Sequence, residues 1–272
     1  MNVTLLAPHL VYLLVDDLGF ANVGWNVPAA VREPITPRID ALHATGATLS
    51  RFYTYRFCSP TRSSLMSGRL PYHVNQQNHP PDLPGGGVPV NMTLLPERLA
   101  PLGYVSHQVG KWHCGMSSVD RLPVSRGFAS SFGYLSGAED HYTNKRGAYV
   151  DLWRNASAAI GEEGGDYSNY KYTAEALRII RAHPPEKKLF LYMAYADVHG
   201  PIQAPDNYTA LYAGISNKQR RLCLAMISAV DTSIGWIVDE LTAQGMYDST
   251  LILWSSDNGG PSDHGNVCRG AA

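Results

Sequence analysis

The sequence predicts an α/β fold, a mostly parallel β-sheet flanked by helices on both faces. Short apolar segments of strand length alternate with longer segments of helical pattern along the chain. With 272 residues, 44% of them hydrophobic, the chain is long enough to bury a large core. No internal repeat and no linker of biased composition divides it, so we expect residues 1–272 to form one domain without a separate second domain.

Apolar runs bounded by turn residues indicate the strands, and capping residues with a following glycine or proline indicate the helices. The expected strands are His9–Val15 and residues 47–54, 104–109, 189–196 and 250–255. The expected helices cover residues 36–43, 59–68, 93–102, 172–182 and 216–244. Residues 77–89 and 161–165 are rich in glycine or proline and are expected to be surface loops.

Charge and hydropathy exclude several classes of partner. The formal net charge of −1 gives no bulk attraction to nucleic acid or to an acidic membrane surface. No uninterrupted apolar run reaches the roughly 18 residues that a membrane span needs. The start of the chain is apolar but has no basic n-region, so we interpret residues 1–15 as a short leader and a core strand rather than a signal peptide.

Two further patterns concern the compartment and the metal chemistry. Four Asn-x-Ser/Thr sequons favour a glycoprotein of the secretory pathway; they begin at Asn2, Asn91, Asn155 and Asn207. The four cysteines include no Cys-x-x-Cys pair, which argues against a zinc site.

Most of the chemically interesting side chains follow the end of a predicted strand. Because ligands bind outside the carboxyl ends of the strands in open α/β sheets, these residues should converge on one edge. They are Asp16, Asp17, Lys111, His113, His199, Asp257 and Asn258.

Two acidic pairs predict a divalent cation site. Adjacent carboxylates such as Asp16 and Asp17 repel each other unless a cation neutralises them, although a turn or helix cap explains such a pair about as well. A second strand-end pair, Asp257 and Asn258, favours the metal. Three carboxylates and one amide oxygen form a hard oxygen set suited to calcium or magnesium.

Residues 58–62, Cys-Ser-Pro-Thr-Arg, predict a nucleophile beside an anion-binding helix start. Pro60 suits the first helical position and Ser59 suits the cap, while Arg62 adds a positive fork for an oxyanion. Alternatives remain open at this point. Cys58 is a buried structural thiol or a thiolate nucleophile. A lone lysine such as Lys111 is more typically a solvated surface residue, and a lone His199 is as often structural as functional.

Five segments together resemble the type I sulfatases, with stretches 132–142 and 198–208 similar to the arylsulfatase B branch. In chain order they are residues 13–19 (Leu-Leu-Val-Asp-Asp-Leu-Gly), 58–62 (Cys-Ser-Pro-Thr-Arg), 110–115 (Gly-Lys-Trp-His-Cys-Gly), 198–201 (Val-His-Gly-Pro) and 256–260 (Ser-Asp-Asn-Gly-Gly). Thr61 replaces the more common serine and keeps its hydroxyl. The resemblance implies an alkaline-phosphatase-like fold.

The resemblance also implies a mechanism. Cys58 is oxidised to formylglycine by a formylglycine-generating enzyme, and the hydrated aldehyde attacks sulfur to form a covalent sulfate ester. The implied metal, calcium rather than magnesium, is held by position 58 and by Asp16, Asp17, Asp257 and Asn258. Asp257 takes the proton of the attacking hydroxyl. The resemblance implies that Cys58 acts together with His113 and Arg62 in catalysis. It implies that sulfate is bound by Lys111 and His199.

The substrate implied is an aryl sulfate or an N-acetylgalactosamine-sulfate-type ester of a glycosaminoglycan, in the lysosome or outside the cell. Alternatives are a phospho- or phosphonate ester hydrolase with the same site, and a truncated inactive form. In the arylsulfatase B branch another active-site lysine follows Asp-Asn-Gly-Gly, whereas no lysine follows Lys218 here. We therefore expect an incomplete N-terminal catalytic domain whose C-terminal part is missing, with an unpaired sheet edge and weak or no activity.

Overall fold

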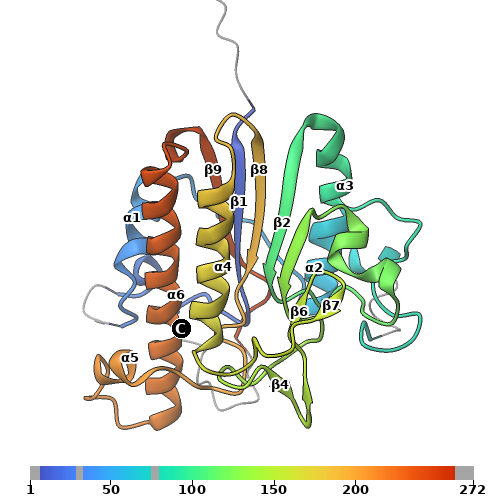
Figure 1. Ribbon diagram of the computed structural model, residues 1–272. Coiled ribbons are helices and arrows are strands. Elements are labelled where there is room, and N and C mark those ends of the chain that lie inside the picture. Colours follow the sequence, from blue (N-terminus) through green and yellow to red (C-terminus); the bar gives the residue numbers. More distant parts are fainter. Residues whose placement is uncertain (1–6, 29–32, 75–79, 261–272) are drawn as a thin grey trace, which may run out of the picture.

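A computed structural model describes residues 7–28, 33–74 and 80–260 of the protein. These residues form a seven-stranded sheet in the order β7-β6-β3-β2-β8-β1-β9 (Figure 1). The strands from β3 to β9 in this order run parallel, while β6 and β7 pair antiparallel at one edge. The predicted mostly parallel sheet is therefore confirmed. A separate two-stranded hairpin, β4-β5, lies beyond the carboxyl ends of the central strands.

The elements alternate along the chain as expected of an α/β fold. The strands are β1 (His9–Val15), β2 (Tyr104–Gly110), β3 (Ser130–Gly133), β4 (Lys145–Arg146), β5 (Tyr149–Val150), β6 (Trp153–Arg154), β7 (Ser157–Ala158), β8 (Lys188–Ala194) and β9 (Thr250–Ser256). The α-helices are α1 (Pro37–Thr45), α2 (Cys58–Ser67), α3 (Leu95–Leu99), α4 (Ser168–Ala182), α5 (Asp206–Ala210) and α6 (Lys218–Ala243). Short 3-10 turns cover Gly24–Asn26, Pro71–Val74, Ala100–Leu102, Val119–Arg121, Pro123–Arg126 and Tyr247–Ser249.

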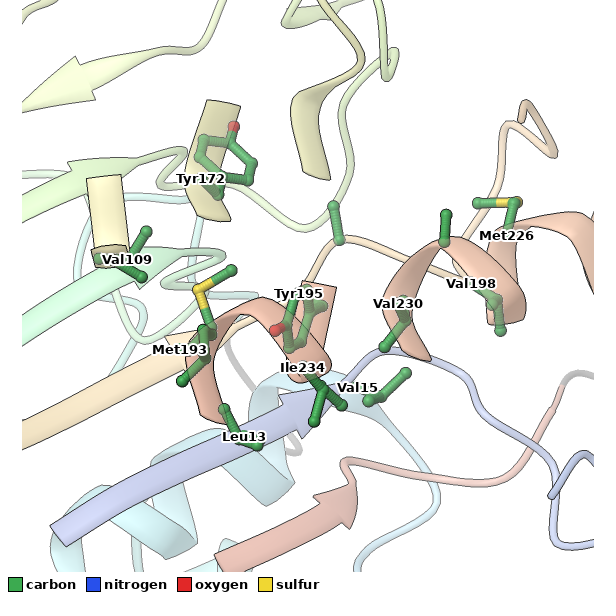
Figure 2. Packing of buried hydrophobic residues seen from close by; sticks show 14 of the residues in the cluster. Leu13, Val15, Val109, Tyr172, Met193, Tyr195, Val198, Met226, Val230 and Ile234 are labelled. Atoms are coloured by element: carbon green, nitrogen blue, oxygen red, sulfur yellow. The ribbon is translucent and has the colours of Figure 1, made fainter. Parts of the chain in front are cut away.

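Helices cover both faces of the sheet, as predicted. On one face, α1, α4 and α6 pack against alternate residues of the central strands. Figure 2 shows Leu13 and Val15 of β1 beside Ile234 of α6 in this core. On the other face, α2 and α3 cover the intervening residues, among them Leu14 and Phe190. Because both faces are buried, the central strands carry apolar residues at nearly every position.

Several predicted elements match closely and others do not. β1 has the predicted bounds, and α6 lies within two residues of its predicted ends. The prediction of a strand at residues 47–54 was wrong: this segment is a turn and irregular coil, with Leu49, Phe52 and Tyr53 between 57% and 84% exposed. Residues 47–54 pair with no strand of the described sheet, so their alternating sequence pattern alone does not make them a strand.

The helix that carries Arg62 begins one residue earlier than predicted. Cys58 is its first residue, and Phe57, not Ser59, occupies the cap position without a side-chain hydrogen bond. Pro60 therefore lies third in the helix. The first four N–H groups of any helix have no acceptor within the helix, so a proline at this position costs no helical hydrogen bond. The Thr61 hydroxyl accepts from the backbone N–H of Tyr55 at 3.0 Å and donates to its carbonyl at 3.2 Å, which fixes the entry into α2.

Two features concern membranes and the secretory pathway. Helix α6 is long and apolar enough to cross a membrane, but 72% of its most apolar stretch is buried inside the protein. It thus packs as a core helix. Asn91, Asn155 and Asn207 of the sequons are exposed, whereas the sequon at Asn2 and the leader up to residue 6 lie outside the described residues.

The sheet ends at β9 on one side. β9 pairs with β1, and no strand pairs with its other edge among the residues described. Leu251 and Leu253 of this strand are 49% and 39% exposed. The expected unpaired edge with exposed apolar side chains is therefore present in this part of the protein.

Candidate active site

Four neighbouring strands deliver the predicted residues to one edge of the sheet. Lys111 follows β2, Asp16 follows β1 and Asp257 follows β9, each as the residue after the strand's last. His199 comes five residues after the end of β8. Because β2, β8, β1 and β9 are adjacent and parallel, their carboxyl ends share one edge.

Cys58 joins a cluster of carboxylates at this edge. Its sulfur and one carboxylate oxygen from each of Asp16, Asp17 and Asp257 all lie within 4.8 Å of one another. The Cys58 Sγ is 3.9 Å from Asp17 Oδ1. Asp16 and Asp257 are completely buried, whereas Asp17 and Cys58 keep partial exposure. Residues up to 241 positions apart, Asp16 and Asp257, therefore build one compact polar centre.

Two buried cations face these carboxylates. Arg62 Nε donates to Asp257 Oδ2 at 3.0 Å, and its Nη2 lies 2.9 Å from the same oxygen and 3.5 Å from Asp16 Oδ1 in ion-pair contacts. Lys111 Nζ donates to Asp16 Oδ2 at 2.5 Å. Both cations are fully buried, so neither is the solvated surface residue that a lone lysine or arginine usually is. They hold the carboxylates in place and partly neutralise them.

The pKa values of the cluster follow from burial and from these charges. Burial opposes ionisation of Asp16, but the charges of Lys111, His199 and Arg62 outweigh it and lower its pKa. Burial and the neighbouring Asp16 instead raise the pKa of Asp257 to about 6. For Cys58, burial and Asp16 raise the thiol pKa, which disfavours the thiolate. The cysteine in its unmodified form is thus a poor nucleophile.

The donor set fits a divalent cation. Asp16 Oδ1 and Asn258 Oδ1 are buried oxygens without a hydrogen-bond donor among the described residues. Leaving such an acceptor unsatisfied is costly, so these atoms indicate a missing partner. Asn258 Nδ2 donates to Asp17 Oδ1 at 2.5 Å, which links the amide to the carboxylate cluster. Carboxylate and amide oxygens match calcium or magnesium.

Two residues of the site adopt an uncommon backbone conformation. Asp17 and His113 have φ angles of 57° and 51°, in the left-handed region that non-glycine residues rarely occupy. Such conformations persist where the surrounding structure holds them, often at functional sites. Here, Asp17 N–H donates to Asp257 Oδ1 at 3.2 Å, and His113 N–H donates to the Leu135 carbonyl at 3.1 Å.

The two predicted histidines occupy different positions around the cluster. His199 Nε2 lies 3.9 Å from Asp17 Oδ2, and its Nδ1 is 2.7 Å from the Gly200 carbonyl. His113 makes no hydrogen bond or ion pair with the carboxylates described, but burial and the charges of Lys111 and Arg62 lower its pKa well below the usual range. Its imidazole is therefore neutral at physiological pH, with a buried Nδ1 that has no partner among the described residues.

The backbone of Gly137 approaches the His113 imidazole so closely that no side chain fits between them. A Cβ at Gly137 would lie 2.7 Å from Cε1 and 2.8 Å from Nε2 of the imidazole. We expect Gly137→Ala to displace the imidazole and to lower kcat for the reaction catalysed at this site by about 10²-fold. A shift of about 1 Å has an effect of this size where catalytic groups must be precisely aligned. The control is Gly214→Ala, where a Cβ meets nothing within 4 Å. Equal kcat values for the two variants, both folded, would contradict this role.

A surface cavity of about 370 Å³ lies beside the site and was not predicted from the sequence. Its lining includes Ala138, Glu139, Lys145, Arg146 and Pro201. Ala138 follows the glycine that contacts His113, and Pro201 lies two residues after His199. Lys145 and Arg146 form β4, too short to give a recognisable strand pattern, so only the folded structure shows their place.

Glu139 in this cavity wall predicts a pH dependence of stability. Burial raises its pKa to about 7, against hydrogen bonds from Asn144 and Tyr172 that favour the charged form. The folded state keeps a proton that the unfolded state loses, so stability falls as the pH rises from about 4.5 to about 7.

We expect Glu139→Gln to remove this decline, a difference on the order of 3 kcal/mol at pH 8 relative to the parent. Denaturant unfolding curves between about pH 4 and pH 8 measure it. The exposed Glu186→Gln serves as control and should follow the parent. Parallel pH profiles for the parent and Glu139→Gln would contradict the assignment.

Comparisons with known proteins agree with this geometry. The Sulfatase family model matches residues 8–271. The chain belongs to the sulfatase family, and the predicted family is confirmed. This chain is 38% identical to arylsulfatase J of Mus musculus over 260 residues, and 31% identical to N-acetylgalactosamine-6-sulfatase of Homo sapiens over 271 residues. Both alignments cover 93% of this chain but 43% and 50% of the relatives, so the chain spans about half their length.

Solved structures give the same result for the fold. The crystal structure of Ps i-CgsB superposes with a TM-score of 0.87 at 31% identity, covering 96% of this chain and 60% of that protein. A second structure of that protein contains k-i-k-neocarrahexaose and superposes with a TM-score of 0.86. The phosphonate monoester hydrolase of Agrobacterium radiobacter shares the fold at 17% identity, with a TM-score of 0.64. The alkaline-phosphatase-like architecture is thereby confirmed.

Proposed function

We propose that this chain carries the active site of a sulfuric ester hydrolase whose nucleophile is formylglycine made from Cys58. The observation that carries the proposal is the position of Cys58, whose sulfur lies among the carboxylates of Asp16, Asp17 and Asp257 at the end of the sheet. The raised pKa of its thiol supports an oxidised side chain over a thiolate, because a protonated thiol attacks poorly.

The oxygen donors of Asp16, Asp17, Asp257 and Asn258, together with position 58, would hold a divalent cation, which we propose to be calcium rather than magnesium. When bound, the cation supplies positive charge that polarises a sulfuryl oxygen and the nucleophile. Formylglycine at position 58 is an aldehyde, and its hydrated form would supply a hydroxyl nucleophile that the thiol of cysteine does not provide. A formylglycine-generating enzyme is the partner that this modification requires.

The remaining side chains bind, orient and move protons. Asp257 Oδ1 is the proposed acceptor of the nucleophile's proton, and Arg62 keeps that carboxylate fixed through Oδ2. His113, neutral in this environment, is the proposed base for the step that releases sulfate. Lys111 and His199 are the proposed sulfate ligands. Their fixed positive and hydrogen-bonding groups stabilise charge that grows on oxygen in the transition state.

The charge of the site favours a sulfate over a phosphate monoester. Asp16, Asp17 and Asp257 contribute three negative charges, and Arg62 and Lys111 contribute two positive charges, so the cluster is −1. A divalent cation changes this to +1. That value balances the single negative charge of a sulfate monoester, whereas a phosphate monoester at neutral pH carries nearly two. The phospho- or phosphonate hydrolase therefore remains the second candidate.

The relatives suggest the class of substrate and the compartment. N-acetylgalactosamine-6-sulfatase is named for a sulfated amino sugar, and Ps i-CgsB has been crystallised with k-i-k-neocarrahexaose. We propose a sulfated glycan, of the N-acetylgalactosamine-sulfate type or an aryl sulfate analogue, as the substrate. Exposed sequons at Asn91, Asn155 and Asn207 support a lysosomal or secreted glycoprotein.

The test combines mass spectrometry with a matched pair of esters. The mass of the Cys58 peptide reports conversion to formylglycine, and release of 4-nitrophenol from 4-nitrophenyl sulfate and 4-nitrophenyl phosphate reports turnover. We expect converted protein to hydrolyse the sulfate slowly, and Cys58→Ala protein not at all. Preference for the phosphate would favour the second candidate. Converted protein that hydrolyses neither ester in the presence of calcium would overturn both.

A further inference from the structure

We propose that Lys145 and Arg146, in the cavity beside the active site, form a second anion-binding subsite that recognises a further acidic group of a polyanionic glycan. This inference rests on the proposed function, because it assigns that active site an extended, multiply charged substrate rather than an isolated sulfate ester. The two residues form β4, which lies beyond the carboxyl ends of β1, β2 and β8 (Figure 1).

The cavity is directly connected to the loops that carry the site histidines. Gly137 packs against the His113 imidazole, and the next residue, Ala138, lines the cavity. Pro201 lines it from the side of His199. The positive charge of Arg146 contributes to lowering the pKa of His113, which places that charge within electrostatic reach of the imidazole. A glycan with its sulfate ester at the active site would thus extend into this cavity.

The wall of the cavity is held in a fixed shape. Gln203 Nε2 donates to Asp140 Oδ2 at 2.8 Å, and the same side chain accepts from the His141 backbone N–H at 2.9 Å. His141 Nε2 lies 3.1 Å from the His199 carbonyl oxygen. These contacts tie the loop before β4 to the loop that carries His199. A subsite on this wall therefore keeps a constant distance from the active site, as recognition of two groups on one glycan requires.

Lys145 and part of the Arg146 guanidinium are available to a ligand, whereas the carboxylates of the cavity wall already accept hydrogen bonds from the protein. Asp140 Oδ1 accepts from the backbone N–H groups of Tyr142 and Thr143. Glu139 is buried and accepts hydrogen bonds from Asn144 and Tyr172. Lys145 is exposed and forms no ion pair within the described residues.

Arg146 is 48% exposed on its side chain and has one ion pair within the described part of the chain, to Asp82 at 2.6 Å. Arg146 also lines the cavity, whose volume is at the lower end of the range for small-ligand sites. That size suits one sugar unit. A sulfate ester and a uronate carboxylate are both oxyanions that a lysine and an arginine bind well.

The experiment measures binding separately from turnover. Cys58→Ala protein with calcium is titrated with a fluorescently labelled chondroitin 6-sulfate hexasaccharide and, in parallel, with a hyaluronan hexasaccharide that carries carboxylates only. We expect Lys145→Met with Arg146→Met to weaken binding of the sulfated hexasaccharide about ten- to a hundredfold, the effect of losing one charged hydrogen bond. Lys145→Arg with Arg146→Lys should retain most of the affinity. Equal losses for hyaluronan would assign the subsite to carboxylates, and a loss confined to the sulfated ligand would assign it to sulfate esters.

The matched control is Lys187→Met with Arg178→Met, at a second cavity lined by other residues. Affinity unchanged in the Lys145 and Arg146 variant, or lowered equally in the control, would overturn the subsite. In turnover, the same variant should raise KM for the hexasaccharide by a larger factor than KM for 4-nitrophenyl sulfate. If no sulfate ester is hydrolysed but hexasaccharide binding depends on these residues, the proposed function fails and the subsite stands. Normal 4-nitrophenyl sulfate turnover without a subsite effect would support the proposed function and overturn the subsite.

Discussion

Replacing Arg62 with methionine is expected to lower the free energy of unfolding by about 3–5 kcal/mol, because it leaves buried carboxylates without their compensating charge. Arg62 is fully buried and contacts Asp257 at 2.9 and 3.0 Å and Asp16 at 3.5 Å. Methionine keeps a similar apolar stem, so the loss reflects charge more than volume. Denaturant unfolding at neutral pH without metal measures it.

The same variant should lower kcat/KM on 4-nitrophenyl sulfate by at least about 10²–10³-fold, the cost of removing one positioned group from a charge-stabilising site. Arg62 Nη1 also donates to the Lys111 carbonyl at 3.2 Å, so its loss frees the segment that carries the proposed sulfate ligand. The arginine therefore supports both the proton acceptor and the lysine. Its effect on kcat should exceed its effect on KM.

Two controls separate buried charge from charge in general. Arg38→Met removes an exposed ion pair with Asp239, with side chains 53% and 54% exposed, and should change stability by no more than about 1 kcal/mol. Asp257→Asn added to Arg62→Met should restore part of the lost stability, because it removes a carboxylate that the arginine had neutralised. An Arg62→Met protein as stable as the parent, or strictly additive losses in the double variant, would contradict the buried charge network.

The sheet could be predicted where a strand is long and buried on both faces. The apolar runs at β1, β8 and β9 located these strands to within about two residues. The outlying strands β4 to β7 have two residues each, and most of their side chains are exposed or half-buried, so no periodicity distinguishes them from loops. Their pairing depends on tertiary contacts, as between Phe132 of β3 and Arg154 of β6.

The carboxylate cluster could be predicted because it needs only the order of parallel strands. Once Asp16, Lys111 and Asp257 are placed at strand ends, the topology of the sheet brings them together. Cys58 is different, because it begins a helix, and its sequence segment alone gives no distance to the carboxylates. Nor does the sequence show the cavity with Lys145, which forms when a long loop is tied back to Gln203 and His199.

Calcium added to the metal-free protein is expected to raise the free energy of unfolding by about 2.7 kcal/mol at a free concentration of one hundred times Kd. The reason is the clustering of three carboxylates with the buried, unsatisfied Asp16 Oδ1 and Asn258 Oδ1. Without a cation the carboxylates repel one another and these two oxygens lack donors among the described residues; with a cation, each of the two oxygens gains a ligand bond. Thermal unfolding after chelation and again after adding calcium measures the gain.

Asp17→Asn is the sharpest test of this site, because Asp17 carries charge in the cluster but is not bound by Arg62 or Lys111 in the structure. The amide keeps the size of the side chain and removes one negative charge, so the calcium-dependent gain in stability should fall by at least half while the metal-free fold remains intact. Asp239→Asn, at an exposed carboxylate, should keep the full gain. A calcium response that is equal in Asp17→Asn and the parent places the cation elsewhere. No response in the parent at millimolar calcium would overturn the cation site and leave Arg62 and Lys111 as the partners of the cluster.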